Sequence, residues 1–185
     1  MDNKLYKAIT YVSGAIDDAA DDGVPWRRQF ITLLRQRGLG FIKVLDPTNK
    51  LPGLLNEIGE TQTNLKDMKQ RGDWDKLSKY AHDIIRIDLR EVDLCDFLVA
   101  RIDNSIHACG TYHEIILASQ QKKPVLLISK QGKAGIPSWL FGILEHEYFF
   151  DSVEECVDYL VGVNNGSIEI DNKWVLIRKQ LEEML

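Results

Sequence analysis

The sequence predicts an α/β fold: a doubly wound, flavodoxin- or Rossmann-like sheet of five parallel strands flanked by helices. Short apolar runs alternate along the chain with longer segments of helical periodicity, a pattern typical of parallel β-α-β units. The 185 residues, 44% hydrophobic and 28% charged, suit a single globular domain. We expect this domain over residues 1–163, and a tail with a helix over residues 164–185 that packs on the core or at a subunit interface.

Five apolar runs are the expected strands. They cover residues 8–13, 41–45, 97–102, 124–129 and 147–150. Gly14 ends the first run and Asp46-Pro47 ends the second, in keeping with their roles in turns.

Helical periodicity is expected over residues 25–37, 74–94, 110–121, 138–144, 152–161 and 173–185. Pro25 opens the first of these helices and Gly38 stops it. Residues 48–75 are polar, and a structureless loop of that length is unusual in a compact domain. We therefore expect a short helix around residues 62–70 and a lid-like role for this segment.

Composition limits the classes of partner and the compartment. The 28 acidic and 23 basic residues give a net charge of −5, which argues against binding to a nucleic acid duplex by neutralising phosphates. Neither a membrane-spanning apolar run nor a signal peptide is recognisable. The three cysteines, Cys95, Cys109 and Cys156, are odd in number and far apart, which favours reduced thiols and a cytoplasmic location.

Cofactor motifs are missing from the sequence. There is no P-loop. A dinucleotide-binding fingerprint follows a strand, whereas Gly38-Leu39-Gly40 precedes a predicted strand. The first strand-to-helix loop holds four aspartates that would repel a pyrophosphate: Asp17, Asp18, Asp21 and Asp22. His107-x-Cys109 has no second ligand pair at zinc spacing. We expect neither a cofactor nor a metal.

Ligands of doubly wound folds bind outside the carboxyl ends of the strands. The segments expected there are residues 13–17, 46–49, 103–114 and 129–136. The candidate substrate-binding residues in them are Ser13, Gly14, Asp17, Asp46, Pro47, Gly110 and Thr111.

Asp88 lies in an unusual place for a charged residue. It follows Ile84 by four residues and precedes Val92 by four, on or beside the apolar face of a predicted helix. An ionised carboxylate there is costly unless it is paired or used. One interpretation is a pairing with Arg86 or Arg90; the other is a functional carboxylate.

Glu114 follows Gly110 by four residues, in the first turns of a helix after a strand end. The amides of a helix N-terminus stabilise negative charge, so we expect Glu114 to be ionised. Such a carboxylate can attack an electrophilic sugar carbon, although glutamate near a helix start is also common for electrostatic reasons alone. Tyr11 is either a core residue or a hydroxyl at the mouth of the site.

Four segments within about residues 8–150 resemble the nucleoside 2-deoxyribosyltransferase family, and their order and spacing carry the resemblance. Thr10-Tyr11-Val12-Ser13-Gly14-Ala15 is similar to the family's opening strand and turn, and Leu45-Asp46-Pro47 is similar to the end of its second strand. The third segment is the stretch in which Asp88 precedes Asp96 by eight residues. The fourth is Gly110-Thr111-Tyr112-His113-Glu114 with the following Lys123-Pro124-Val125.

The resemblance implies a two-step exchange without a cofactor. Glu114 would attack C1′ of a 2′-deoxynucleoside and form a covalent deoxyribosyl ester, while Asp88 shuttles a proton to and from the base nitrogen. Tyr11 would hold Glu114 by a hydrogen bond. A second nucleobase then takes the sugar, as in nucleotide salvage, in an enzyme that assembles as a homo-oligomer.

Two departures from the family pattern bear on the substrate. The family often has an Asp two residues before the glycine, to bind sugar hydroxyls; here Ala108 is in that place, and Asp103 or Asn104 are possible substitutes. Relatives that hydrolyse nucleotides carry Ser and Arg in the first turn, where this chain has Ala15 and Asp17. This favours an unphosphorylated substrate, although Arg27 or Arg28 remain candidates for a phosphate contact.

Two rival functions stay open. The first is an N-glycoside hydrolase that acts on a deoxynucleoside or its 5′-monophosphate, with water as the acceptor. The second is a nucleotide-sensing module that keeps the fold without turnover.

Overall fold

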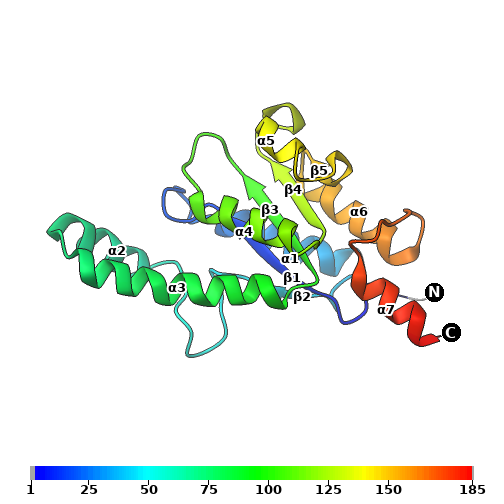
Figure 1. The fold of residues 1–185 in the computed structure, drawn as a ribbon, viewed down its shortest axis with the longest axis horizontal. Coiled ribbons are helices and arrows are strands. Elements are labelled where there is room, and N and C mark those ends of the chain that lie inside the picture. Colours follow the sequence, from blue (N-terminus) through cyan, green and yellow to red (C-terminus); the bar gives the residue numbers. More distant parts are fainter. Residues whose placement is uncertain (1–2, 185) are drawn as a thin grey trace.

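The computed structural model describes residues 3–184 and contains the five-stranded parallel sheet that the sequence predicts (Figure 1). The strands are β1 (Ile9–Gly14), β2 (Lys43–Leu45), β3 (Phe97–Ile102), β4 (Val125–Ser129) and β5 (Phe149–Phe150). Their order in the sheet is β2-β1-β3-β4-β5, and every neighbouring pair is parallel. β2 and β5 are shorter than the apolar runs that predicted them, so the edges of the sheet are short.

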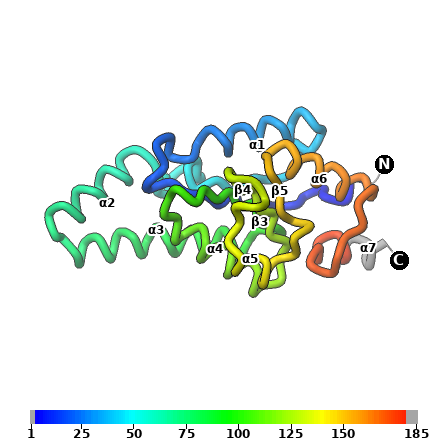
Figure 2. The backbone as a smooth tube through the Cα atoms, turned by 90° about the horizontal axis from the view of Figure 1, so that it is seen from above, coloured from blue at the N-terminus to red at the C-terminus, as the bar shows by residue number. Residues whose placement is uncertain are grey.

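Helices cover both faces of the sheet (Figure 2). α1 (Val24–Gln36) and α6 (Val153–Asn165) pack together on one face, and α3 (Trp74–Leu94) and α4 (Cys109–Gln120) cover the other. α6 continues four residues beyond its expected end at residue 161. The short helix α5 (Ser138–Phe141) and two single turns, η1 (Lys133–Gly135) and η2 (His146–Tyr148), connect the last strands.

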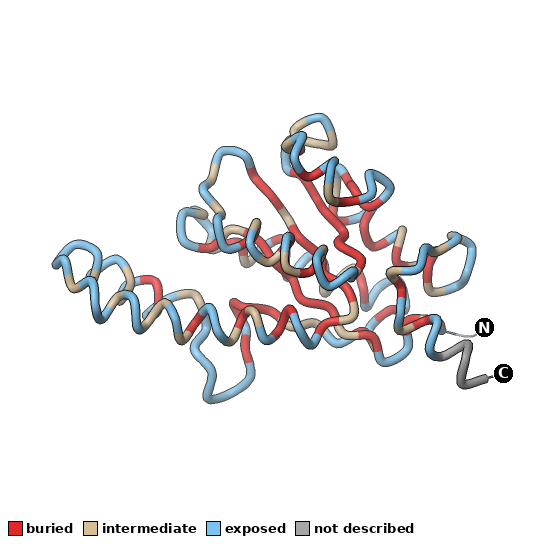
Figure 3. Tube along the Cα trace, viewed as in Figure 1, coloured by how far each residue is buried: buried red, intermediate tan, exposed pale blue. Residues whose placement is uncertain are grey.

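The buried residues form one core on each face of the sheet (Figure 3). Phe30 and Leu34 of α1 pack with Val157 and Leu160 of α6 in the first core. Trp174, which precedes α7 (Val175–Met184), is 2% exposed and belongs to this core, so the C-terminal segment packs on the domain. The expected helix over residues 173–185 reaches Leu185, which lies outside the described residues.

The segment between β2 and α3 forms a helix that extends beyond the sheet. α2 (Glu60–Arg71) packs against α3, and Figure 1 shows the two helices projecting together from one end of the molecule. α2 is longer than the short helix expected at residues 62–70. Gly72 ends it in a left-handed conformation, φ 70°, which glycine adopts without a Cβ clash.

The strand order fixes where a ligand can bind. From β1 the chain passes outward to β2, and it then returns across the sheet to β3 on the other side of β1. This reversal leaves a crevice at the carboxyl ends of β1 and β3, where ligands of open α/β sheets bind. In residues 3–184, no helix is sufficiently long and apolar to span a bilayer.

Candidate active site

A cleft at the carboxyl end of β1 consists of two adjoining pockets. The strand-end pocket, about 270 Å³, lies between the β1–α1 loop and the start of α4. The hairpin pocket, about 400 Å³, lies between α2, α3 and α4. Both are lined by Asp17, Glu57, Lys69, Cys109, Gly110 and Glu114. The two pockets therefore meet at Glu57 and Glu114.

Glu114 is held by two hydroxyl groups from β1. The Tyr11 hydroxyl donates to Glu114 Oε1 at 3.1 Å, and the Ser13 hydroxyl donates to Oε2. Both donors are buried, because β1 is the second strand of the sheet and is covered on both faces. The carboxylate therefore has a fixed orientation in the cleft.

The protonation of Glu114 differs from the expectation that a helix N-terminus keeps it ionised. Burial, together with the charge of Asp88, raises the pKa of Glu114 to about 7, although the hydrogen bonds from Ser13 and Tyr11 act to lower it. Glu114 is the sixth residue of α4, beyond the free amides of the first turn. The pKa of Glu114 therefore lies close to neutral pH.

Asp88 is buried on α3, with 5% of its surface exposed, and its partner is a residue from a distant loop. Lys50 Nζ lies 2.5 Å from Asp88 Oδ1, and the Lys50 side chain is fully buried. The interpretation in which Asp88 pairs with Arg86 or Arg90 is wrong, because its ion pair is with Lys50. Arg90 instead contacts Asp93 at 3.7 Å on the exposed face of α3.

Glu57 completes this group of charges and was not predicted from the sequence. Lys50 Nζ lies 3.3 Å from Glu57 Oε1, and the Glu57 carboxyl also hydrogen-bonds Asp88. Burial and the charge of Asp88 raise the pKa of Glu57 to about 9, which Lys50 only partly offsets. One lysine therefore neutralises one of two adjacent carboxylates, and the second carboxyl group retains a proton at neutral pH.

The backbone of Glu57 is held on both sides. Its N–H donates to the Pro47 carbonyl at 3.0 Å, and its own carbonyl accepts from Gln62 Nε2 at 2.7 Å. The same Gln62 amide donates to Asp17 Oδ1 at 2.7 Å. Gln62 thereby connects α2 to the β1–α1 loop across the cleft. The segment expected to act as a lid forms a wall of the cleft in this structure.

Five of the seven predicted substrate-binding residues line the strand-end pocket: Gly14, Asp17, Pro47, Gly110 and Thr111. Ser13 lies behind them and contacts Glu114. Asp46 does not face the cleft. It accepts hydrogen bonds from the Thr48 amide and hydroxyl at 2.8 and 2.7 Å and lies 3.7 Å from Arg27 Nε.

Arg27 has a structural position beneath the cleft. It is fully buried, and its guanidinium donates to the carbonyls of Val12, Gly23 and Gly14. These bonds tie the end of β1 to the residue before α1 and occupy the guanidinium, so Arg27 is not free to contact a phosphate. Arg28, the other basic residue considered for a phosphate contact, is exposed on α1 and lines neither pocket.

The two possible substitutes for the missing sugar-binding aspartate point elsewhere. Asp103 accepts hydrogen bonds from Lys130, Ser105 and Gln131, and these bonds hold its pKa well below its usual range. Asn104 donates to the Gly135 carbonyl. Neither residue lines the two pockets that meet at Glu114.

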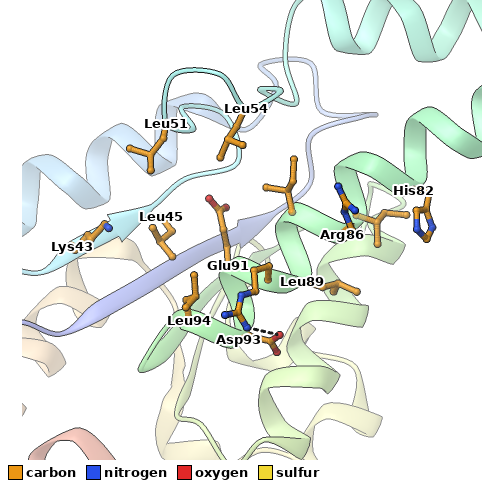
Figure 4. Close-up of a pocket in the computed structure, with 13 residues that line it drawn as sticks. Lys43, Leu45, Leu51, Leu54, His82, Arg86, Leu89, Glu91, Asp93 and Leu94 are labelled. Atoms are coloured by element: carbon orange, nitrogen blue, oxygen red, sulfur yellow. Dashed lines mark ion pairs between the residues drawn. The ribbon is translucent and has the colours of Figure 1, made fainter.

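A separate groove of about 750 Å³ runs along the outside of α3 and contains none of the predicted catalytic residues. Figure 4 shows Leu45, Leu51, Leu54 and Leu94 along it and Glu91 between them. Glu91 is one turn beyond Asp88 on α3, and burial raises its pKa to about 7. Among residues 3–179, whose side chains the structure describes, no group of three or more His, Cys, Asp or Glu side chains is arranged to hold a metal ion.

Comparisons with known proteins give a match in structure alone. No family model matches the sequence, and no curated protein does either. A 2-deoxyribosyltransferase from Bacillus psychrosaccharolyticus aligns with a TM-score of 0.55 and 18% identity, over 82% of this chain and 92% of that one. A conserved protein from Enterococcus faecalis V583 aligns over 97% of this chain and 99% of that one, with a TM-score of 0.41 and 14% identity.

The first of these alignments agrees with the topology described above. It spans most of both chains, and its low identity restricts the conclusion to the fold. The suspected resemblance is thus confirmed at the level of the fold: this chain has the fold of a 2-deoxyribosyltransferase.

Proposed function

We propose that the protein is an N-deoxyribosyltransferase that moves 2-deoxyribose from one nucleobase to another. The observation that carries this proposal is the arrangement of carboxyl groups around one cleft. Glu114 is oriented by Tyr11 and Ser13 on one side, and the acidic wall formed by Asp88, Glu57 and Lys50 lies on the other. A nucleophile and a proton donor on either side of a substrate are what glycosidic exchange requires.

In the first step, an oxygen of ionised Glu114 bonds to C1′ of the bound 2′-deoxynucleoside while the C1′–N bond breaks. The electron pair of that bond leaves with the base, which takes a proton from the acidic wall. The transition state resembles an oxocarbenium ion, and the Glu114 charge stabilises it. The product is a free base and a deoxyribosyl ester of Glu114.

In the second step, a nitrogen of another base attacks C1′ and the ester bond breaks. Glu114 leaves as a carboxylate, and the acidic wall recovers the proton of the incoming base. Atoms and charges balance over the two steps without a cofactor. If water takes the place of the second base, the same residues hydrolyse the nucleoside.

The pockets suit the two parts of a nucleoside. The walls of the hairpin pocket include Leu65, Leu77, Ala81 and Ile84, apolar surfaces against which a planar base can pack. The strand-end pocket has a polar lining and suits the sugar. Asp17 and Asp18 line it, and Arg27 is fully engaged below it, which supports an unphosphorylated 5′ end.

The proposal includes a cytoplasmic homo-oligomer. Cys95, Cys109 and Cys156 are all free thiols, in keeping with a reducing compartment. Two apolar side chains near α5 are exposed, Trp139 by 76% and Phe141 by 46%, and large exposed apolar groups of this kind favour a subunit contact.

The test follows base release and base exchange by chromatography. Purified protein is incubated with a panel of 2′-deoxynucleosides and their 5′-monophosphates, with and without a free acceptor base, beside the Glu114→Gln variant. Formation of a new deoxynucleoside only with the acceptor, and only by the wild type, supports a transferase. Free base without exchange indicates a hydrolase, and tight binding without turnover indicates a sensor.

A further inference from the structure

We infer that Glu57 is the acid that protonates the leaving base, and that Asp88 orients it as an ionised hydrogen-bond acceptor. This inference rests on the proposed function. It differs from the assignment that the sequence suggests, in which Asp88 itself gives and takes the proton. The geometry of Lys50 and the position of Glu57 at the junction of the two pockets carry it.

The first argument concerns the charge on Asp88. A general acid must carry a proton when the substrate binds. The fully buried ammonium of Lys50 lies 2.5 Å from Asp88 Oδ1 and only 3.3 Å from Glu57 Oε1, so the cation stabilises a carboxylate on Asp88 more strongly than one on Glu57. Asp88 is therefore the ionised member of the pair.

The second argument concerns where the remaining proton resides. Besides Lys50, Asp88 on α3 and Glu114 on α4 act on Glu57, and both disfavour a further negative charge. The buried Arg27 on α1 favours one, and the exposed Asp17 and Lys69 lie at the cleft lining. The hydrogen bond between Glu57 and Asp88 requires one proton between the two carboxyl groups, and the lysine places it on Glu57.

The third argument is access to the substrate. Glu57 lines both pockets, whereas Asp88 lines only the hairpin pocket, and the glycosidic bond of a nucleoside spans the two. The Pro47 carbonyl and the Gln62 amide fix the backbone of Glu57. A pre-positioned carboxyl group of this kind transfers a proton without a costly rearrangement.

The proposed proton transfer balances. The Glu57 O–H bond breaks and an N–H bond forms on the departing base as the C1′–N electron pair moves onto that base. Glu57 is then a carboxylate beside Asp88, with Lys50 as their shared counter-ion. When the second base attacks C1′, its N–H proton returns to Glu57.

The test compares two leaving groups that differ in their need for a proton. The base of 2′-deoxyinosine needs protonation to leave, whereas the cationic base of 7-methyl-2′-deoxyguanosine leaves as a neutral molecule. The variants are Glu57→Gln, Asp88→Asn and, as a matched control, the exposed and neighbouring Glu60→Gln. We expect Glu57→Gln to reduce kcat on 2′-deoxyinosine by about 10²-fold or more, and on the methylated substrate by about threefold or less.

Three outcomes would overturn the inference. If Glu57→Gln reduces turnover of both substrates equally while wild type uses both, Glu57 has only a structural role and the proposed function stands. If turnover of 2′-deoxyinosine alone is lost in Asp88→Asn and not in Glu57→Gln, Asp88 is the acid, and the proposed function again stands. If wild-type protein releases neither base, the proposed function fails, and the inference with it.

A second measurement does not depend on activity. Infrared spectra at pH 8 should show the carbonyl stretch of a protonated carboxyl group in wild type and in Glu60→Gln. We expect Glu57→Gln to lose most of this band, with an unchanged melting temperature as evidence of folding. Persistence of the full band in folded Glu57→Gln, or its loss in Asp88→Asn alone, would place the proton on another residue.

Discussion

The two sides of the cleft hold their carboxyl groups in different ways. On the β1 side, Glu114 receives hydrogen bonds from two uncharged hydroxyls, Tyr11 and Ser13. On the α3 side, Asp88 and Glu57 share the buried cation Lys50. Neutral donors orient a carboxylate without tying its charge to a fixed cation, as a nucleophile requires. A cation shared by two carboxyl groups keeps one ionised and one protonated, as an acid–base pair requires.

The largest expected effect concerns the β1 side. We expect Glu114→Gln to lower base release by about 10⁴-fold, because an amide cannot form the glycosyl ester. Its melting temperature at pH 8 should be no lower than that of wild type. The pKa of Glu114 is raised in the folded protein, so its ionisation destabilises the fold as the pH rises from about 4.5 through 7, and glutamine does not ionise. Chromatographic rates and thermal melts test both statements; residual activity near the wild-type level would exclude Glu114 as the nucleophile.

The next effect concerns the α3 side. Lys50→Met leaves Asp88 and Glu57 buried without their cation, and we expect a loss of unfolding free energy of about 3 kcal/mol. The carboxyl groups then bind protons more tightly in the folded state than in the unfolded state, so the loss should grow as the pH rises from 6 to 9. Urea unfolding at several pH values measures it, with the exposed Lys66→Met as control. If the loss of unfolding free energy does not change with pH, Lys50 does not act as the counter-ion of Asp88 and Glu57, and the contrast with the β1 side fails.

A smaller effect is expected from Tyr11→Phe, which removes one donor to Glu114. The rate at pH 8 should fall by about tenfold, and the pKa of Glu114 should rise, because that hydrogen bond lowers it. The acidic limb of the rate profile should therefore move to higher pH. Tyr80→Phe, on α3 and away from Glu114, is the control. If the acidic limb of the Tyr11→Phe rate profile lies at the same pH as that of wild type, it reports the titration of a group other than Glu114.

The smallest effect is the pH dependence of the wild-type enzyme. Below pH 7, Glu114 gains a proton and ceases to be a nucleophile; above about pH 9, the acidic wall loses its proton. A bell-shaped profile of kcat/KM between these values is expected for 2′-deoxyinosine. In Glu57→Gln only the acidic limb should remain. An alkaline limb of equal size in this variant would show that the limb reports something other than proton delivery by Glu57.

The β1 side of the cleft was predictable because its residues lie within regular elements. The alternation of apolar runs defines β1 and α4, and their ends place Tyr11, Ser13 and Glu114 at one edge of the sheet. The helix Trp74–Leu94 has the predicted bounds, and its periodicity placed Asp88 on the buried face. The spacing of apolar residues therefore predicts both the bounds of these elements and the side of α3 that is buried.

The α3 side was only half predictable. Lys50 and Glu57 belong to an irregular segment with exposed leucines, in which no periodicity indicates burial. Lys50 is buried because its amide donates to Asn56 Oδ1 at 2.6 Å and its side chain reaches Asp88, 38 positions further along the chain. For the same reason the sequence suggested only arginines on α3 as structural partners of Asp88. Asp46 also lies at a strand end, and this position alone predicted a ligand contact. In the structure its carboxylate accepts hydrogen bonds from Thr48 and lies beside Arg27.

The most direct test of glycosyl transfer through Glu114 is mass spectrometry of the protein quenched during turnover. Wild type and Glu114→Gln are mixed with 2′-deoxyinosine without an acceptor base, quenched in acid and digested. We predict a mass increase of one deoxyribosyl group on the wild-type peptide that contains Glu114, its disappearance when an acceptor base is added before the quench, and no such increase in the variant. Base release at the wild-type rate by Glu114→Gln, or a deoxyribosyl group on another residue, would contradict the mechanism.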